Sequence, residues 1–430
     1  MKSSEGQRPA AISLSPGEQL AVHGGIPVRD PLRPWPNWPT PTAQARRNLD
    51  AVLDNGRWAI TSPPGRPLFE RRFSEMFAAY NGVRHCVPVD HGSSALVISL
   101  ESLRLDYGDR VLVPALTWVA SASAVLRAGL VPVLADVDPE TGCIDPAGLD
   151  LSVQPRAVVA VHWSCAMADV PALQEVCDPL GITVLEDAAQ AHGAEWLGRR
   201  AGSLGRLGCF SMQHSKTLTG GEGGAVITDD DTLAPTLEEL RADSRRYADP
   251  RTAPQGLELE ESATIMGANF CMSEFSAAVL CAQLDVLDAQ HETRNRNYAL
   301  LSRLIEGLPG VRLLRQRPEQ TRLSIYEAVL VFDPLPRRMT NASLAVALSA
   351  ELHTRFYPPR EPLARSHLLK PWTKPTLAPL SEAFVAANHD RAHPNAEYLA
   401  GQAVLTPHST FLGDEADMRD VADAIAKVVR

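Results

Sequence analysis

The sequence predicts an α/β fold in which a large domain with a mostly parallel sheet precedes a smaller α+β domain. The first observation is the alternation of short apolar segments with amphipathic stretches between Arg84 and Asp229, which is typical of βαβ units. The second is a change of pattern after about residue 290, where mixed short strands precede a closing amphipathic helix. The third is length, because 430 residues suffice for two domains with buried cores.

The expected strands are short apolar runs bounded by polar or turn-forming residues. In the large domain they cover residues 85–89, 109–115, 131–137, 157–162, 182–185 and 224–228. In the small domain a strand is expected at 328–332, and one face of the closing helix carries Met418, Val421, Ile425 and Val428. These patterns divide the chain into an N-terminal arm (1–40), a large domain (41–290) and a small C-terminal domain (291–430).

The N-terminal arm has two parts. Residues 1 to about 20 are polar and unpatterned, and we expect them to be mobile. The segment from Arg33 to Pro39 contains three prolines among its seven residues. Each proline fixes its own φ and disfavours helix in the residue before it, so this segment is expected to be rigid and extended.

Composition excludes several classes of function. The net charge is -10 and the pI is about 5.7, so we expect no binding to nucleic acid or to an anionic membrane. No stretch has the pattern of a signal peptide or a membrane span, which predicts a cytoplasmic protein with small-molecule partners. The seven cysteines form no CxxC pair, so we expect reduced thiols and no metal site.

A candidate phosphate site follows the strand expected at 85–89. The sequence His91-Gly92-Ser93-Ser94 opens an apolar helix. Gly92 permits close approach of the backbone, and Ser93 and Ser94 place hydroxyls beside the free N–H groups of a helix N-terminus. An ordinary serine N-cap is the alternative interpretation.

Polar and aromatic residues also follow two other expected strands. Asp187 ends the apolar run 181–186, where carboxyl ends of strands collect ligands in open α/β sheets, although a helix cap would use the same residue. Gln190 follows it closely and can hydrogen-bond a phenolic oxygen. Trp118 can stack on a flat heteroaromatic ring, or it can be an ordinary core residue.

The most informative residue is Lys216, which precedes the glycine-rich run Gly220 to Gly224. Its amine can hold the aldehyde of pyridoxal phosphate as a Schiff base, while the Asp187 carboxylate keeps the pyridine nitrogen protonated. Ser211 and Gln213 precede the lysine as possible phosphate partners. A surface lysine before a plain hairpin is the alternative. We favour the cofactor interpretation, because three separate segments supply the phosphate cradle, the carboxylate and the amine.

These motifs resemble the DegT/DnrJ/EryC1/StrS family of fold type I, pyridoxal phosphate-dependent aminotransferases, whose large domain holds a mostly parallel sheet of the seven-stranded type. The segments that carry the resemblance are Glu186 to Gly193, Lys216 and Gly221 to Gly224. It implies that Lys216 and Asp187 are catalytic. It also implies cofactor contacts from Ser93, Ser94, Trp118, Gln190, Ser211 and Gln213. Asn269 matches a family asparagine that reaches the phosphate of the neighbouring subunit, so a homodimer with shared active sites is expected.

Within the family, residues 241–247 and 35–39 resemble the branch of L-glutamine:scyllo-inosose and 2-deoxy-scyllo-inosose aminotransferases of aminoglycoside antibiotic biosynthesis. The resemblance implies transfer of an amino group from an amino acid, L-glutamine above all, to a cyclic ketone such as a ketocyclitol. The sequence 243–245 and Cys271 depart from nucleotide-sugar members. Trp163 and Ser164 depart from the usual family pattern and leave the ketone open.

Candidate substrate residues lie outside these motifs. Arg245 and Arg246 can form the fork that binds the carboxylate of the amino donor, or they can be surface arginines. Tyr357 resembles a family tyrosine of the small domain. Three alternatives to ketocyclitol transamination remain: a nucleotide-keto-sugar aminotransferase, a dehydratase of the 3-amino-5-hydroxybenzoate synthase type, and a non-enzymatic scaffold.

Overall fold

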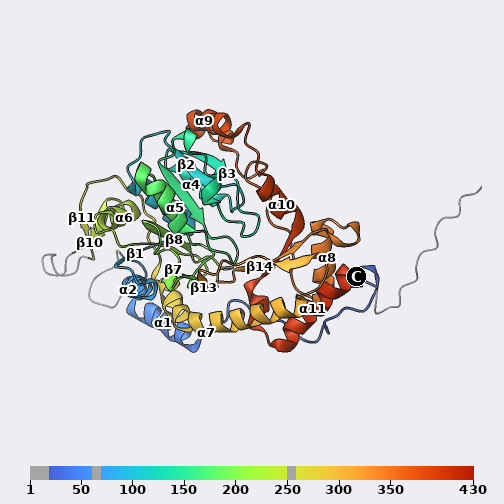
Figure 1. Cartoon of the computed structure of the whole chain (residues 1–430). Helices are drawn as coiled ribbons and strands as arrows, with labels where there is room; N and C mark the ends of the chain where they lie inside the picture. The colour runs from blue at the N-terminus through green and yellow to red at the C-terminus, as the bar shows by residue number, and fades with distance from the viewer. Residues whose placement is uncertain (1–18, 61–68, 249–257) are drawn as a thin grey trace, which may run out of the picture.

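The large domain is built on a seven-stranded sheet (Figure 1). The computed structural model describes residues 19–60, 69–248 and 258–430. The strand order is β1-β9-β8-β5-β4-β2-β3. The strands are β1 (His85–Val89), β2 (Arg110–Pro114), β3 (Val131–Ala135), β4 (Ala157–Val161), β5 (Thr183–Asp187), β8 (Leu207–Ser211) and β9 (Gly224–Thr228). β9 pairs antiparallel with β1 and β8, and the other pairs are parallel, which confirms the mostly parallel sheet.

The strand β8 is absent from the strands expected from sequence. Its five residues include Gly208, a poor strand former, and the apolar run around Phe210 is short. Pairing on both sides, with β5 and β9, stabilises the strand. A Cβ on Gly208 would lie 2.2 Å from the carbonyl oxygen of Gly202, so the close packing of this strand requires glycine.

Helices enclose the sheet. They are α1 (Ala43–Asn55), α2 (Phe69–Asn81), α3 (Gly92–Ser102), α4 (Ala120–Arg127), α5 (Val170–Cys177) and α6 (Leu233–Arg241). α3 packs against β8, β9, α4 and α6. Leu96, Val97, Ile98 and Leu100 of α3 are all buried. Because most residues of α3 are buried, its N-terminus is held firmly at the end of the sheet.

The helix α7 (Glu274–Ile305) is a continuous element of 32 residues. It packs against α1 and α2 of the large domain and against α11 (Glu415–Val429) of the small domain. Figure 1 shows it running between the two parts of the molecule. The boundary expected near residue 290 falls inside this helix, and we keep that division as a proposal.

The small domain contains a second, antiparallel sheet of order β12-β14-β15. Its strands are β12 (Val311–Leu313), β14 (Glu327–Phe332) and β15 (Ala403–Pro407), and its helices include α8 (Asn341–Leu352) and α10 (Pro394–Gln402). Met418, Val421, Ile425 and Val428 of α11 are all fully buried, as the face pattern predicts. Minor sheets join β13 (Gln320–Arg322) to β6 (Glu195–Trp196) and β7 (Arg199–Arg200), and β10 (Arg245–Tyr247) to β11 (Leu259–Glu261).

The described part of the N-terminal arm is fastened to the small domain. The buried Arg29 guanidinium lies 2.7 Å from the Asp417 carboxylate and 2.9 Å from that of Asp420, both on α11. Trp35 donates its indole N–H to the carbonyl oxygen of Leu352. The mobility expected for residues 1 to about 20 falls almost entirely outside the described residues, whereas residues 19–40 are tied down by these contacts.

A segment of the C-terminal region covers β3, the edge strand of the large sheet (Figure 1). It comprises α9 (Ala378–Asn388) and the loop that leads to α10. The Asn388 side chain accepts from the Leu134 N–H at 2.7 Å and donates to the Pro132 carbonyl at 2.9 Å. These bonds satisfy backbone groups that would otherwise be free on an edge strand.

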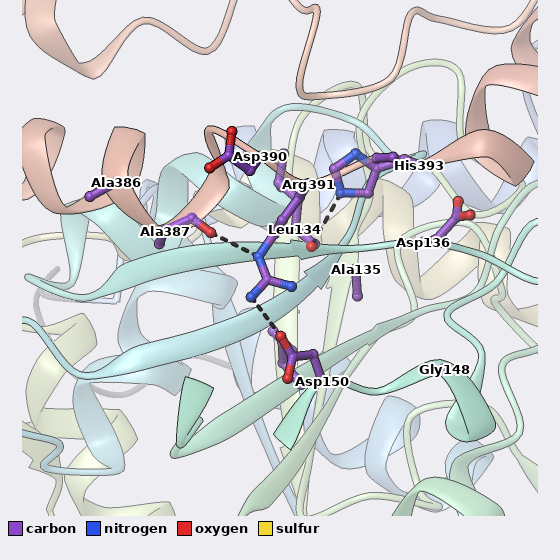
Figure 2. A pocket seen from close by; sticks show the side chains of 12 residues that line it. Leu134, Ala135, Asp136, Gly148, Asp150, Ala386, Ala387, Asp390, Arg391 and His393 are labelled. Carbon is purple, nitrogen blue, oxygen red and sulfur yellow. Dashed lines mark hydrogen bonds and ion pairs between the residues drawn. The ribbon is translucent and has the colours of Figure 1, made fainter. Parts of the chain in front are cut away.

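The loop after α9 adds further contacts with the large domain (Figure 2). A His393 ring nitrogen lies 3.2 Å from the Leu134 carbonyl oxygen, and Arg391 forms an ion pair of 2.8 Å with Asp150. These side chains flank a cavity of about 540 Å³. Among the described residues, no helix is long and apolar enough to cross a membrane.

Candidate active site

A cavity of about 970 Å³ opens where the carboxyl ends of the parallel strands meet the small domain. Lys216, Asp187, Gln190, Trp118 and Tyr357 line it, together with Ser93, Ser94, Ser211 and Gln213. The structure therefore brings together nine of the residues singled out from sequence. In the described part of the chain, no cluster of three or more His, Cys, Asp or Glu side chains is arranged to hold a metal ion.

Asp187 is the last residue of β5 and is 5% exposed. The hydroxyl of Ser121 donates to its carboxylate at 2.8 Å, and the N–H of Ala189 donates at 3.2 Å. Burial raises the pKa of Asp187 above its ordinary value, although these hydrogen bonds and the nearby Lys216 charge oppose the shift. Between β5 and the next element, β6, the structure has turns and no helix, so the helix-cap interpretation is wrong. A buried carboxylate of this kind suits a protonated ring nitrogen as its partner.

Lys216 lies in the loop between β8 and β9, within the cavity. Its ammonium nitrogen is 4.1 Å from the centroid of the Tyr326 ring, so the amine is held over an aromatic face. The Tyr326 hydroxyl lies 3.0 Å from the Ser215 hydroxyl and adds a second contact with the same loop. The amine thus lies against Tyr326 at the cavity, and the interpretation as a plain surface lysine is disfavoured.

Behind Asp187 lies a buried pair that the sequence argument did not assign. Glu186 is fully buried and accepts three backbone N–H bonds from the turn at 202–205. The Nε2 atom of His162 lies 2.9 Å from the same carboxylate, while the His162 Nδ1 accepts the N–H of Ala168. This pattern requires the Nε2 proton, so His162 donates to Glu186. The pair fixes the ends of β4 and β5 and therefore the position of Asp187.

The candidate phosphate site lies at the N-terminus of α3. The N-cap residue is His91, not a serine, and its side chain caps no backbone N–H group. The serine-cap interpretation is therefore wrong, and the first N–H groups of the helix remain available to an anion. A Cβ on Gly92 would lie 2.5 Å from the Cβ of Ser211, so the end of β8 approaches the helix only because residue 92 is glycine. This cradle fits a phosphate group.

Trp118 is 44% exposed, so it is not a core residue. It lines the cavity, and the guanidinium of Arg360 lies 4.3 Å from its ring centroid.

Gln190 accepts the backbone N–H of Ser164 at 2.6 Å. The side chains of Gln190 and Trp118 project from loops that follow strand ends, where the sequence argument expects them. Gln213 accepts from the N–H and hydroxyl of Ser215, which orders the loop before Lys216.

The candidate substrate residues separate into two groups. Tyr357 lines the cavity, but Arg245 and Arg246 do not. On β10, the Arg245 guanidinium lies 3.3 Å from Asp243 and that of Arg246 lies 3.2 Å from Glu260. Sequence reasoning missed Arg355, Arg360 and Glu327, which line the cavity from the small domain. Arg355 and Arg360 lie within three residues of Tyr357, which the sequence argument had singled out, and this proximity was the available signal.

Asn269 is exposed and does not line the cavity of its own chain. Its side-chain oxygen accepts the N–H of Cys271 at 3.2 Å, and its backbone bridges to Ala242. The next residue, Phe270, lines the cavity, and its carbonyl accepts the N–H of Asp90. The segment thus passes beside the phosphate cradle while Asn269 itself faces outward.

Solved structures of similar fold define the class of protein. A 3-amino-5-hydroxybenzoic acid synthase is 29% identical, with a TM-score of 0.78 over 92% of this chain and 98% of that chain. DesI, solved in the presence of its TDP-sugar product, is 28% identical, with a TM-score of 0.76 over 95% and 96%. The fold is that of the pyridoxal phosphate-dependent transferases of fold type I.

The family follows from sequence comparison. The model of the DegT/DnrJ/EryC1/StrS aminotransferase family matches residues 41–425. The chain belongs to this family. It is 45% identical over 417 residues to the L-glutamine:2-deoxy-scyllo-inosose aminotransferase of Streptoalloteichus tenebrarius, covering 96% of this chain and 97% of the relative. It is 38% identical over 421 residues to the L-glutamine:scyllo-inosose aminotransferase of Streptomyces griseus, covering 95% and 97%. These matches confirm the resemblance drawn from the motifs.

Proposed function

We propose that this enzyme transfers the α-amino group of L-glutamine to a ketocyclitol of the 2-deoxy-scyllo-inosose type, with pyridoxal 5'-phosphate as cofactor. The observation that carries the proposal is the cavity in which Lys216 and the buried Asp187 lie together with an uncapped helix N-terminus. The donor and acceptor classes come from relatives that are 42% to 45% identical over almost the whole chain.

Each residue would then have a definite task. When bound, the cofactor supplies an electron sink for the carbon that loses its proton. The Lys216 amine moves that proton between the substrate carbon and the cofactor. Asp187 keeps the ring nitrogen protonated, Trp118 covers one face of the ring, and Gln190 contacts its hydroxyl. The phosphate would be held by Ser93, Ser94, Ser211 and Gln213, and by Asn269 of the neighbouring subunit.

The burial of Asp187 supports this assignment. A carboxylate removed from water is stabilised by a cation at hydrogen-bond distance, and a protonated ring nitrogen is such a cation. Arg355 and Arg360 extend the proposal to the amino donor, because they are the arginines that reach the cavity from the small domain. We propose that one of these two arginines binds the α-carboxylate of the amino donor. Within one chain, Arg245 and Arg246 then have no part in binding this carboxylate.

The proposal has three further parts. The uncovered position of Asn269 suits a homodimer in which each subunit completes the other's phosphate site. The cytoplasmic location expected from the sequence stays a prediction. The similarity to 3-amino-5-hydroxybenzoic acid synthase keeps dehydration as the second candidate reaction.

The test is an assay of the purified enzyme, loaded with pyridoxal 5'-phosphate, with α-¹⁵N-labelled L-glutamine and a panel of ketones. The panel contains 2-deoxy-scyllo-inosose, scyllo-inosose and a nucleotide-linked keto-sugar. We expect ¹⁵N in an aminocyclitol, detected by mass spectrometry, and equimolar 2-oxo acid. Loss of water from the cyclic substrate without incorporation of ¹⁵N would favour the dehydratase instead. Transfer to the nucleotide-linked sugar alone would contradict the ketocyclitol assignment.

A further inference from the structure

The carboxylate of Glu327 is held inside the cavity by two hydroxyl groups. Glu327 is the first residue of β14 and lines the cavity. The Tyr357 hydroxyl donates to its Oε1 atom at 2.6 Å, and the Ser164 hydroxyl donates to its Oε2 atom at 3.1 Å. Both donors are neutral, so neither contact neutralises the charge of the carboxylate.

The two donors are themselves fixed. Tyr357 exchanges backbone hydrogen bonds with Leu405 of β15 in both directions, at 3.0 and 2.7 Å. Burial, together with the neighbouring Glu327 charge, raises the pKa of Tyr357, so its hydroxyl stays protonated and continues to donate. The N–H of Ser164 donates to Gln190, which places the serine between Glu327 and the proposed cofactor contact.

The hydrogen-bonding capacity of Glu327 is only partly used. A carboxylate has about four acceptor positions, and the two hydroxyls occupy one on each oxygen. The unused positions favour a group that donates hydrogen bonds and carries no negative charge. The proposed substrates have this chemistry in common, since the side chain of glutamine ends in an NH₂ group and a ketocyclitol carries hydroxyls. L-Glutamate, in contrast, would bring a second carboxylate to the same place.

We propose that Glu327 is a specificity residue that accepts hydrogen bonds from the side-chain amide of L-glutamine and, in the second half-reaction, from a hydroxyl of the ketocyclitol. The same charge excludes L-glutamate by repulsion. This inference rests on the proposed function, because it assumes that both substrates use the cavity in turn. It also assigns a role to Ser164, a residue that departs from the usual family pattern. The Ser164 side chain orients the Glu327 carboxylate.

The test is the Glu327→Gln variant, which keeps the shape of the side chain and removes its charge. The holoenzyme is mixed with L-glutamine or L-glutamate, and single-turnover absorbance of the bound cofactor gives a dissociation constant and a maximal rate for each donor. We expect the preference for glutamine over glutamate to fall roughly ten- to a hundredfold, mainly through the dissociation constants. The KM for 2-deoxy-scyllo-inosose should rise in the same variant.

Matched variants separate this role from general damage. Glu361→Gln removes one exposed carboxylate that does not line the cavity, and it should leave the donor preference unchanged. Tyr357→Phe and Ser164→Ala each remove one hydroxyl that orients Glu327 and keep its charge, so they should shift the preference less. These two variants carry the test if Glu327→Gln fails to fold or to bind cofactor.

Two failures are distinguishable. A wild-type enzyme that does not react with L-glutamine would contradict the proposed function. A wild-type enzyme that reacts, combined with an unchanged donor preference in Glu327→Gln, would contradict only the role of Glu327. An equal loss with both donors would likewise overturn it, because a specificity residue must affect the two substrates differently.

Discussion

Gly92 and Ser211 are in such close contact that a Cβ on the glycine would lie 2.5 Å from the Cβ of the serine. This contact joins the N-terminus of α3 to the end of β8. The two segments that supply the proposed phosphate site are thus held at a separation that no other residue at position 92 permits without a shift of the backbone.

Substitution Gly92→Ala should therefore weaken cofactor binding. The added methyl group forces α3 and β8 apart, and overpacking of this kind costs about 1–3 kcal/mol of stability. Cofactor titration followed by absorbance, together with thermal unfolding of the apoprotein, measures both effects. Gly401→Ala is the control, because nothing lies within 4 Å of a Cβ built at this position in α10. That variant should be stabilised by about 0.5–1 kcal/mol. Normal cofactor affinity in Gly92→Ala would place the phosphate elsewhere.

Substitution Lys216→Ala should abolish turnover, because Lys216 is the lysine that lines the cavity. Cofactor can still bind through the phosphate cradle, so the measurement must follow aminocyclitol formation rather than colour. Addition of a small primary amine should restore part of the activity by replacing the missing side chain. Substantial product from the pure variant without added amine would remove Lys216 from the mechanism.

Substitution Asp187→Asn should slow turnover by on the order of a thousandfold or more, since a charge-assisted pair worth several kcal/mol would be lost from the transition state. Ser121→Ala, which removes only one hydrogen bond to the carboxylate, should have a much smaller effect. Steady-state rates at saturating substrate give the comparison. Near-normal turnover of Asp187→Asn would show that another group faces the ring nitrogen.

The apoprotein of the same variant provides a readout independent of activity. Burial raises the pKa of Asp187 from 3.8, so in the wild type this group contributes less to stability as the pH rises through the raised pKa. An asparagine has no charge to bury. The unfolding free energy of Asp187→Asn minus that of the wild type should therefore increase as the pH rises from acid to neutral.

Mixing Lys216→Ala and Asn269→Asp subunits should restore activity if Asn269 acts across a dimer interface. In the hybrid dimer, one site combines an intact Lys216 with an intact Asn269 from the other chain, while the second site carries both defects. The aspartate is chosen because its charge repels phosphate and keeps the parent variant nearly inactive. Exchange of subunits is verified by native mass spectrometry. If exchange occurs without recovery, Asn269 belongs to its own subunit or has no part in the site.

Substitution Asn388→Ala should destabilise the large domain by about 1–3 kcal/mol, because it leaves backbone groups of Pro132 and Leu134 without partners. The free edge of β3 should also promote aggregation, which light scattering during thermal unfolding detects. Glu382→Ala, an exposed position on the same helix, is the control and should change stability little. Equal stability of the two variants would mean that water satisfies the edge strand.

Much of the fold is predictable from periodicity. The apolar runs predict the positions of β1 to β5 and β9 to within a few residues. The spacing of the apolar residues in α11 predicts its buried face. β8 was missed because its stability comes from its two neighbours rather than from its own residues. The hydrogen bonds between Asn388 and β3 were also missed. A single side chain that hydrogen-bonds a strand far away in the sequence leaves no periodic pattern.

The site was predictable where a residue ends a strand, as Asp187 does, or precedes a glycine-rich turn, as Lys216 does. The resemblance to a family added Tyr357 and Asn269, which lack such a local signal. Glu327 was missed because it lies just before the strand expected at 328–332, where sequence alone does not show that its side chain reaches the cavity. Arg245 and Arg246 suited the chemistry of a carboxylate fork, but the acidic partner of Arg246, Glu260, is known only once β10 and β11 pair.

The uninterrupted helix α7 limits how relatives of this enzyme can be recombined. Its 32 residues extend about 48 Å at 1.5 Å per residue, and each residue turns the helix by 100°. A chimaera joined near residue 290 would keep the reading frame but combine half of one helix with half of another. Every inserted or deleted residue at that junction would rotate the small domain relative to Lys216. Exchange of acceptor specificity between relatives should therefore transplant α7 whole, with the small domain attached.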